Sequence, residues 1–384
     1  MINTTTRRDM MAIAGLGAVA ASLPARAAES GNGMLIINAL GGLENPNLAL
    51  AKPQGDNPVD TGLPDIDART IADAHTSGLT AVNITLGYVG GDVGDPFEYT
   101  VRTIGQWDDV LRAHPGDLLK VNSAADIEAA RSDGKIGVIY GFQNAAMVGN
   151  DAARVDIFAG LGVRVIQLTY NPANQLGGGS MAPEGMGLTP FGHAVVERLN
   201  ARRVMVDLSH SGRQICLDAA RASKQPISIN HTGCRALCDL PRNKTDEELK
   251  LVASKGGFVG IYFMPFLTAD GHPHAQDVVA HIDHAVNVCG EDHVGVGTDG
   301  DVTGIDDLKA YGAYLAKQVA DRASQGLGAS GERADTYPFV VDLRGPDQFE
   351  KLASLLKARG YSQRRIEKIL GENFLRFAKD VWGG

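Results

Sequence analysis

Short apolar segments alternate with amphipathic segments along most of the chain. The apolar segments are rich in β-branched residues and are apolar at consecutive positions, which is typical of strands buried on both faces of a parallel sheet. They comprise residues 34–38, 80–86, 136–142, 164–170, 204–208, 226–230, 258–263 and 293–298. The segments between them have a helical period and include residues 65–75, 152–159, 191–201, 213–221, 246–253 and 278–289.

Eight strand-and-helix units predict a fold of class α/β, a (β/α)8 TIM-type barrel. Gly78, Gly134, Gly162 and Gly256 each follow a predicted helix and precede a strand, where a left-handed residue commonly ends the helix. A doubly wound open sheet is the second choice, because no G-x-G-x-x-G motif follows the first strand. Residues 348–381 carry apolar side chains at helical spacing, and we expect C-terminal helices covering the barrel.

Two connections are too long for simple turns. Pro172–Pro190 follows the fourth predicted strand, and Asp301–Asp347 follows the eighth. Long loops at the carboxyl ends of barrel strands commonly carry lids and specificity elements.

The first 27 residues are predicted to be an export signal. Arg7 and Arg8 precede a mildly apolar stretch from Met10 to Leu23, and Ala25-Arg26-Ala27 forms a small-x-small cleavage site. The arginine pair favours a twin-arginine signal and the periplasm; an ordinary secretory signal is the alternative. Residues 28–384 are then expected to form a single barrel domain.

Composition narrows the classes of partner. The net charge is -9 and no segment reads as a basic face, so nucleic acid is not expected as a partner. No apolar run reaches the ~20 residues that a bilayer span needs, so no integral membrane span is expected. Free buried thiols are favoured over one disulfide for Cys216, Cys234, Cys238 and Cys289.

Polar residues follow the predicted strands at the end where barrel enzymes place their active sites. In chain order they are Asn38, Thr85, Gln143, Tyr170, Asn171, Asp207, His210, Asn230, His231, Tyr262, Asp299 and Asp301. His210 and His231 could meet at one mouth as zinc ligands, with Asp299 as a base or third ligand. The plainer alternatives are a helix-capping histidine and a turn-forming aspartate.

Other candidates are weaker. His272 and His274 lie in a Gly/Pro loop without a nearby carboxylate pattern, and His281 and His284 lack the H-E-x-x-H motif. Arg242 could hold a substrate carboxylate through two parallel hydrogen bonds, or simply cap a surface loop.

Several segments together resemble the membrane (renal) dipeptidase family, peptidase family M19. They are residues 187–192 (GLTPFG), 207–211 (DLSHS), 230–232 (NHT), 241–243 (PRN) with Asp246, 256–257 (GG), 294–299 (VGVGTD) and 370–376 (LGENFLR). The resemblance implies a two-zinc hydrolase of dipeptides and suggests a homodimer. It assigns His210 and His231 to one zinc, Arg242 to the substrate carboxylate and Asp299 to acid/base chemistry.

The chain departs from the family pattern at the second zinc. Leu40 and Gly42 stand where the family has His-x-Asp ligands, Gln143 replaces the bridging Glu, and Tyr170 replaces a substrate-polarising His. We therefore expect one zinc ion, bound by His210, His231 and the Gln143 amide oxygen, with the second site lost. Tyr170 and Asn171 are expected to contact the substrate.

Three functions follow as hypotheses. The first is a dipeptidase-like metallohydrolase of a small peptide or amide, working through this reduced, mononuclear site. The second is a non-hydrolytic isomerase or lyase acting on a modified peptide or secondary metabolite. The third is a non-catalytic periplasmic binder of a small ligand.

Overall fold

The computed structural model describes residues 33–51, 64 and 66–383. One parallel sheet runs through this part of the chain. Its main path follows the order β1-β2-β4-β5-β6-β7-β8-β9, and β3 pairs with the first half of β4. The strands are β1 (Ile36–Asn38), β2 (Leu79–Thr85), β3 (Leu118–Val121), β4 (Ile136–Phe142), β5 (Val163–Gln167), β6 (Met205–Asp207), β7 (Ser228–Thr232), β8 (Phe258–Ile261) and β9 (Val294–Val296).

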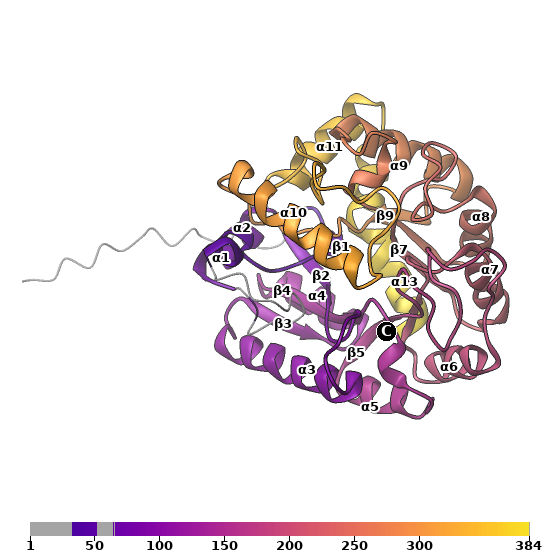
Figure 1. The fold of residues 1–384 in the computed structure, drawn as a ribbon. Coiled ribbons are helices and arrows are strands. Elements are labelled where there is room, and N and C mark those ends of the chain that lie inside the picture. The colour runs from indigo at the N-terminus through magenta and orange to yellow at the C-terminus, as the bar shows by residue number, and fades with distance from the viewer. Residues whose placement is uncertain (1–32, 52–63, 65, 384) are drawn as a thin grey trace, which may run out of the picture.

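Backbone hydrogen bonds bring the last strand back to the first. The Ala39 N–H donates to the Val296 oxygen at 3.0 Å, and the Asp299 N–H donates to the Leu40 oxygen at 2.9 Å. The eight strands of the main path therefore form a nearly closed barrel surrounded by helices (Figure 1), which confirms the predicted fold class.

The six helical segments named from the sequence, and the C-terminal helices, are present. The structure adds strand β3 and helices at Pro46–Ala51, Pro96–Ala113 and Ala124–Ser132, and the helix Leu308–Ser324 lies inside the stretch predicted as a long loop. The α-helices are α1 (Pro46–Ala51), α2 (Ala68–Thr76), α3 (Pro96–Ala113), α4 (Ala124–Ser132), α5 (Arg154–Gly160), α6 (Pro190–Ala201), α7 (Arg213–Ala222), α8 (Asp246–Ser254), α9 (Ala275–Cys289), α10 (Leu308–Ser324), α11 (Gln348–Ala358), α12 (Gln363–Glu367) and α13 (Asn373–Trp382).

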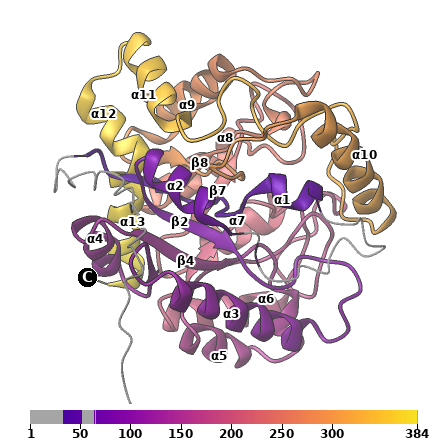
Figure 2. The same ribbon diagram turned by 90° about the vertical axis from the view of Figure 1, so that its left-hand side faces the viewer.

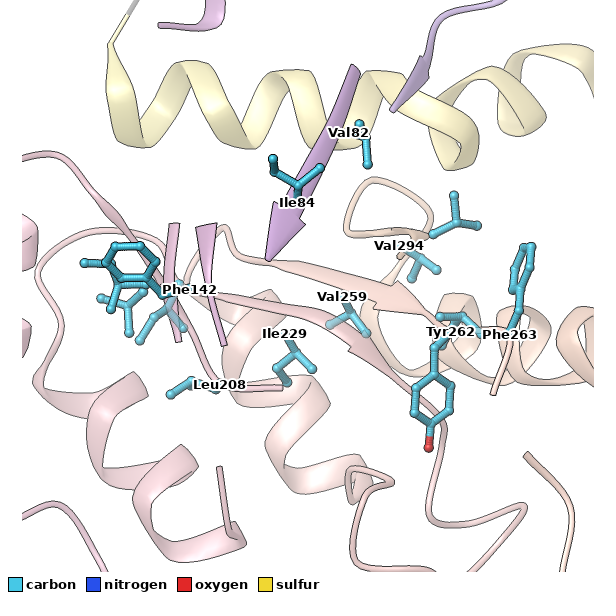
Figure 3. Packing of buried hydrophobic residues seen from close by; sticks show 14 of the residues in the cluster. Val82, Ile84, Phe142, Leu208, Ile229, Val259, Tyr262, Phe263 and Val294 are labelled. Carbon is cyan, nitrogen blue, oxygen red and sulfur yellow. The ribbon is translucent and has the colours of Figure 1, made fainter. Parts of the chain in front are cut away.

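The core has two parts. A large cluster packs between the strands and the surrounding helices, and Figure 3 shows side chains from β2, β7, β8 and β9 within it. A smaller cluster joins residues near the starts of strands, such as Ile37, Met205 and Phe258, to Phe374 and Phe377 of α13. Figures 1 and 2 place α10 and α13 at opposite ends of the barrel. Helix α13 therefore covers the end at which the strands begin.

Local features match the sequence expectations. Gly78, Gly134, Gly162 and Gly256 have positive φ angles of 71°, 67°, 93° and 79°, as predicted for residues that end helices. Residues 172–189 contain no helix or longer strand.

Several predictions concern the ends and surface of the chain. The predicted signal segment lies outside the described residues. Within the described residues, no helix has the length and hydropathy for crossing a bilayer. The four cysteines carry free thiols, and Cys216, Cys234 and Cys238 are buried.

Candidate active site

Five of the predicted residues line one cavity at the carboxyl ends of the strands. The cavity has a volume of about 250 Å³, and its lining includes Tyr170, Asn171, His210, Arg242 and Asp299. Tyr170 and Asn171 follow β5, His210 follows β6, and Asp299 follows β9. Helix α10 contributes the facing wall through Leu315, Val319 and Arg322. The fold thus brings together side chains that lie up to 152 positions apart, as between Tyr170 and Arg322.

His210 and His231 form a close imidazole pair. Their ring centroids are 5.0 Å apart, and both side chains are buried. Burial, followed by the charge of Arg242, holds the pKa of each imidazole well below its usual value. Both rings are therefore neutral at pH 7, which is the state in which an imidazole binds a metal.

Asn171 fixes which nitrogen of His210 is protonated. The Asn171 amide donates from Nδ2 to the Leu327 oxygen at 2.9 Å, so its Oδ1 is the acceptor for His210 Nδ1 at 2.7 Å. His210 Nε2 then carries the lone pair, and it has no hydrogen-bond partner among the described residues. Both ring nitrogens of His231 are likewise buried and unpartnered within that part of the chain.

A buried network under the histidines holds the ends of β6 and β7. The Asp207 carboxylate accepts from the backbone N–H groups of Ser209 and Asn230, each at 3.0 Å. The Ser209 hydroxyl in turn accepts from the His231 N–H at 3.0 Å. The backbone at both histidines is therefore fixed by side chains that the sequence places immediately beside them.

Asp299 is suited to exchanging a proton. Its Oδ1 accepts from Gln143 Nε2 at 3.3 Å. Burial raises the pKa of Asp299 to about 6, although Arg242 and the Gln143 hydrogen bond act in the opposite direction. Its φ of 58° is left-handed, so Asp299 is also the turn residue that its glycine neighbours indicated.

Arg242 offers one arm to the cavity. The residue is 1% exposed, and its Nη1 donates to the Ser209 oxygen. Its Nη2 is buried and has no hydrogen-bond partner within the described chain. A carboxylate bound there would satisfy this arm and neutralise a buried charge.

Leu40 and Gly42 lie in a closed junction on the β1 and β9 side, which we call the seam (residues 38–42 and 298–301). Asn38 Nδ2 donates to Thr298 Oγ1, and the Thr298 N–H donates to Asn38 Oδ1, both at 2.8 Å. A Cβ on Gly42 would lie 2.0 Å from Asp301 Oδ1. Leu40 is buried, and a larger residue at 42 would have to displace the Asp301 side chain, whose Oδ1 accepts from the Glu44 N–H at 2.9 Å.

The four histidines of the two other candidate pairs make contacts of their own. His281 Nδ1 accepts from the Cys234 N–H at 2.8 Å, and its Nε2 donates to the Leu267 oxygen at 3.0 Å. His284 contacts Asp246 Oδ1 at 2.7 Å. His272 lies near Asp335, and His274 near Asp342. Both ring nitrogens of His281 are therefore engaged in the fold, whereas His272 and His274 are exposed and lie outside the cavity.

The donor atoms of the site determine whether it could bind a metal ion. The three unpartnered imidazole nitrogens fit a metal that takes two histidines. Across residues 33–51, 64 and 66–383, however, no three His, Cys, Asp or Glu side chains form a group that could hold a metal. The protein thus supplies an imidazole pair that fits as part of a metal site, without a third strong ligand beside it.

Sequence reasoning missed Arg322 and Glu332. Arg322 donates from Nη2 to Tyr170 Oη at 3.1 Å and to Glu332 Oε1 at 2.9 Å. Both lie in the stretch predicted as a loop, and no motif marked them. The only signal that could have identified them was the presence of an Arg and a Glu in a long connection that follows the last predicted strand.

An imidazole pair and a buried carboxyl thus lie together at the carboxyl ends of the strands of a parallel barrel, the end at which barrel enzymes place their active sites. Residues 76–326 match the family model for membrane dipeptidase, peptidase family M19. The chain therefore belongs to the M19 family, whose members are metal-dependent hydrolases.

Individual relatives agree with this assignment. The chain is 29% identical to an uncharacterised protein in the pqqA 5′ region of Klebsiella pneumoniae, over 75% of this chain and 98% of that protein. It is 28% identical to the dipeptidase tcpJ of Claviceps purpurea (strain 20.1), over 73% of this chain and 60% of that protein. It superposes on the crystal structure of an amidohydrolase from Pseudomonas aeruginosa with a TM-score of 0.75 and 30% identity, covering 91% and 97% of the two chains.

Proposed function

We propose that this protein hydrolyses the amide bond of a small, dipeptide-sized substrate that carries a free carboxylate. One observation carries the proposal: a single cavity is lined by Arg242, His210 and Asp299, and Arg242 Nη2 and His210 Nε2 have no hydrogen-bond partner among the described residues. The first group suits a carboxylate, and the other two suit reaction at a nearby carbonyl.

Arg242 and Asp299 divide the work of binding and proton transfer. Arg242 binds the substrate carboxylate and so positions the amide bond beside Asp299. Asp299 removes a proton from the attacking water as the new C–O bond forms. It then returns that proton to the leaving nitrogen as the C–N bond breaks. A carboxyl whose pKa is about 6 can do both near neutral pH.

His210 and His231 would hold one metal ion, with further ligands from water, substrate or the Gln143 amide oxygen. A bound divalent ion supplies acidity to a coordinated water and polarises a carbonyl oxygen. Leu40 and Gly42 offer no ligand atoms for a second ion, so we propose one ion per chain, zinc in the first instance. The two neutral imidazoles support this proposal.

A second candidate is acid/base catalysis without hydrolysis, such as isomerisation or elimination. Two observations favour it. No third strong metal ligand lies beside the two histidines among the described residues, and the positive charges of Arg242, Arg322 and Lys244 help to lower the pKa of His210. These charges disfavour a divalent cation and favour an anionic ligand.

Metal analysis combined with a substrate panel separates the candidates. Protein purified after export would be assayed for zinc and tested on dipeptides, N-acyl amino acids and their carboxamides. About one ion per chain with hydrolysis supports the first candidate. Turnover without hydrolysis and without metal supports the second. Binding without any turnover contradicts both and favours a ligand-binding protein.

A variant of the predicted export signal tests where the protein is located. We propose that the twin-arginine segment exports the folded chain to the periplasm. Replacing both arginines, Arg7→Lys and Arg8→Lys, should leave the protein in the cytoplasmic fraction.

A further inference from the structure

A short chain of contacts connects the segment after β9 to His210. Arg322, near the end of α10, makes two parallel hydrogen bonds to Glu332, from Nη2 to Oε1 at 2.9 Å and from Nε to Oε2 at 3.2 Å. The same Nη2 donates to Tyr170 Oη at 3.1 Å. The Tyr170 ring stacks on the His210 ring, with centroids 4.2 Å apart and planes 23° from parallel.

The direction of the Arg322 hydrogen bond determines what Tyr170 can do. A guanidinium is only a donor, so the phenol oxygen of Tyr170 is the acceptor in that bond. The hydroxyl hydrogen therefore remains to be donated, and Arg322 is the only hydrogen-bond partner of Tyr170 Oη in the described part of the chain. Tyr170 is 6% exposed and lines the cavity that also holds Arg242 and Asp299.

The supporting residues hold this geometry in place. Arg322 also donates to the Leu327 oxygen at 3.2 Å, the same oxygen that accepts from Asn171. Arg322 is thus tied to a carboxylate and to a backbone oxygen on its own side of the cavity. Glu332 lies beyond residue 326, where the match to the family model ends.

We propose that Tyr170 is a catalytic hydrogen-bond donor to the oxygen of the reacting carbonyl, and that Arg322, held by Glu332, is the residue that positions it. As water adds to the carbonyl carbon, negative charge builds on that oxygen, and a fixed O–H donor stabilises it. The proton stays on Tyr170 throughout, so Asp299 alone carries the proton exchange. This inference rests on the proposed hydrolytic function.

Kinetics of four variants test the proposal on the exported protein. Tyr170→Phe should lower kcat by about 10²-fold with KM within about threefold, because it removes one oxyanion donor. Arg322→Met should lower kcat by about tenfold, and Arg322→Lys should restore part of the loss. The double variant that combines Tyr170→Phe with Arg322→Met should be no slower than Tyr170→Phe alone, since both substitutions act through one hydrogen bond.

A matched control lies on the same helix. Lys317→Met removes an ion pair with Asp321 on α10 away from the cavity, and it should leave kcat and KM unchanged. Independent, multiplying losses in the double variant would overturn the positioning role. An effect of Tyr170→Phe on KM alone would overturn the catalytic role.

A binding measurement keeps this proposal distinguishable from the hydrolytic one. A dipeptide phosphinate presents the tetrahedral oxygen of the reaction, whereas propionate presents only a carboxylate. By calorimetry, Tyr170→Phe should weaken phosphinate binding at least about tenfold and leave propionate binding unchanged. Equal weakening of both ligands overturns the Tyr170 role alone. A wild-type protein that neither binds the phosphinate nor hydrolyses the panel overturns both proposals.

Discussion

The two sides of the barrel mouth differ in whether their buried polar groups have hydrogen-bond partners within the described residues. On the side of β5 to β7, His210, His231 and Arg242 present buried polar atoms that are unpartnered within the described residues. On the side of β1 and β9, the seam joins Asn38 to Thr298 and Asp299 to Leu40 by hydrogen bonds. An enzyme keeps unsatisfied groups where a ligand will satisfy them. The comparison therefore places the unpartnered binding groups on the histidine side and structural closure on the seam, where Asp299 contributes to the closure through its backbone and to the chemistry through its carboxyl.

His231→Ala should have the largest effect on this comparison. It removes one of two imidazole ligands, so bound zinc should be lost and hydrolysis should fall by about 10³-fold or more. Metal content by mass spectrometry and activity on the best dipeptide measure this. His272→Ala, at an exposed histidine outside the cavity, is the control. Unchanged zinc in the His231 variant would show that the metal is bound elsewhere.

Arg242→Lys should come next. Lysine keeps the charge and loses the forked geometry, so KM for carboxylate-bearing substrates should rise by about 10- to 100-fold. The carboxamide of the same substrate should be affected far less, because it lacks the charge that Arg242 binds. An equal loss on acid and amide would show that Arg242 supports the fold of the site without contacting the substrate.

Gly42→Asp tests the seam by restoring the residue type that the family resemblance implies. The new side chain meets Asp301 within the seam, so the free energy of unfolding should fall by about 1–3 kcal/mol. Bound metal should stay at one ion per chain, since Leu40 still offers no ligand. Two tightly held ions in this variant, or in the unmodified protein, would mean that the seam opens to admit a metal.

Gln143→Glu should give the smallest effect, a shift in pH dependence. Hydrolysis needs the ionised Asp299 carboxylate, so kcat/KM should fall as the pH drops through about 6. The Gln143 hydrogen bond lowers the pKa of Asp299, and a carboxylate in its place raises it by repulsion. The acid limb should therefore move to higher pH by about one unit.

A matched substitution checks that shift. Gln214→Glu places the same new carboxylate beside Asp218, outside the cavity. Its kcat/KM profile should follow that of the unmodified protein. If the Gln143 variant also follows it, a group other than Asp299 controls the acid limb.

The barrel and its strand-end residues could be predicted from the sequence because both depend on local pattern. Continuous β-branched runs indicate buried parallel strands, and the residue after each run must lie at the same end of the barrel. β3 was not predicted, because Leu118–Val121 has only four residues and Lys120 interrupts its apolar run. Its two middle residues are half-buried. Its pattern resembles an irregular connection.

Helix α10 and its contribution to the site could not be predicted in the same way. Leu315 is the only buried residue of this helix, so the helix makes few contacts with the barrel core that could have fixed its position in advance. The contact between Arg322 and Tyr170 joins residues 152 positions apart. No spacing rule reaches that far, and only the fold brings the two together.

The Asp299 amide that donates to Leu40 has a consequence for how this enzyme fails on heating. The same residue supplies the acid/base carboxyl and one of the last hydrogen bonds holding the barrel shut. Fraying between the first and last strands would swing the carboxyl away from the substrate while most of the molecule stays folded. Inactivation should then precede melting of the helices, and it should reverse on cooling.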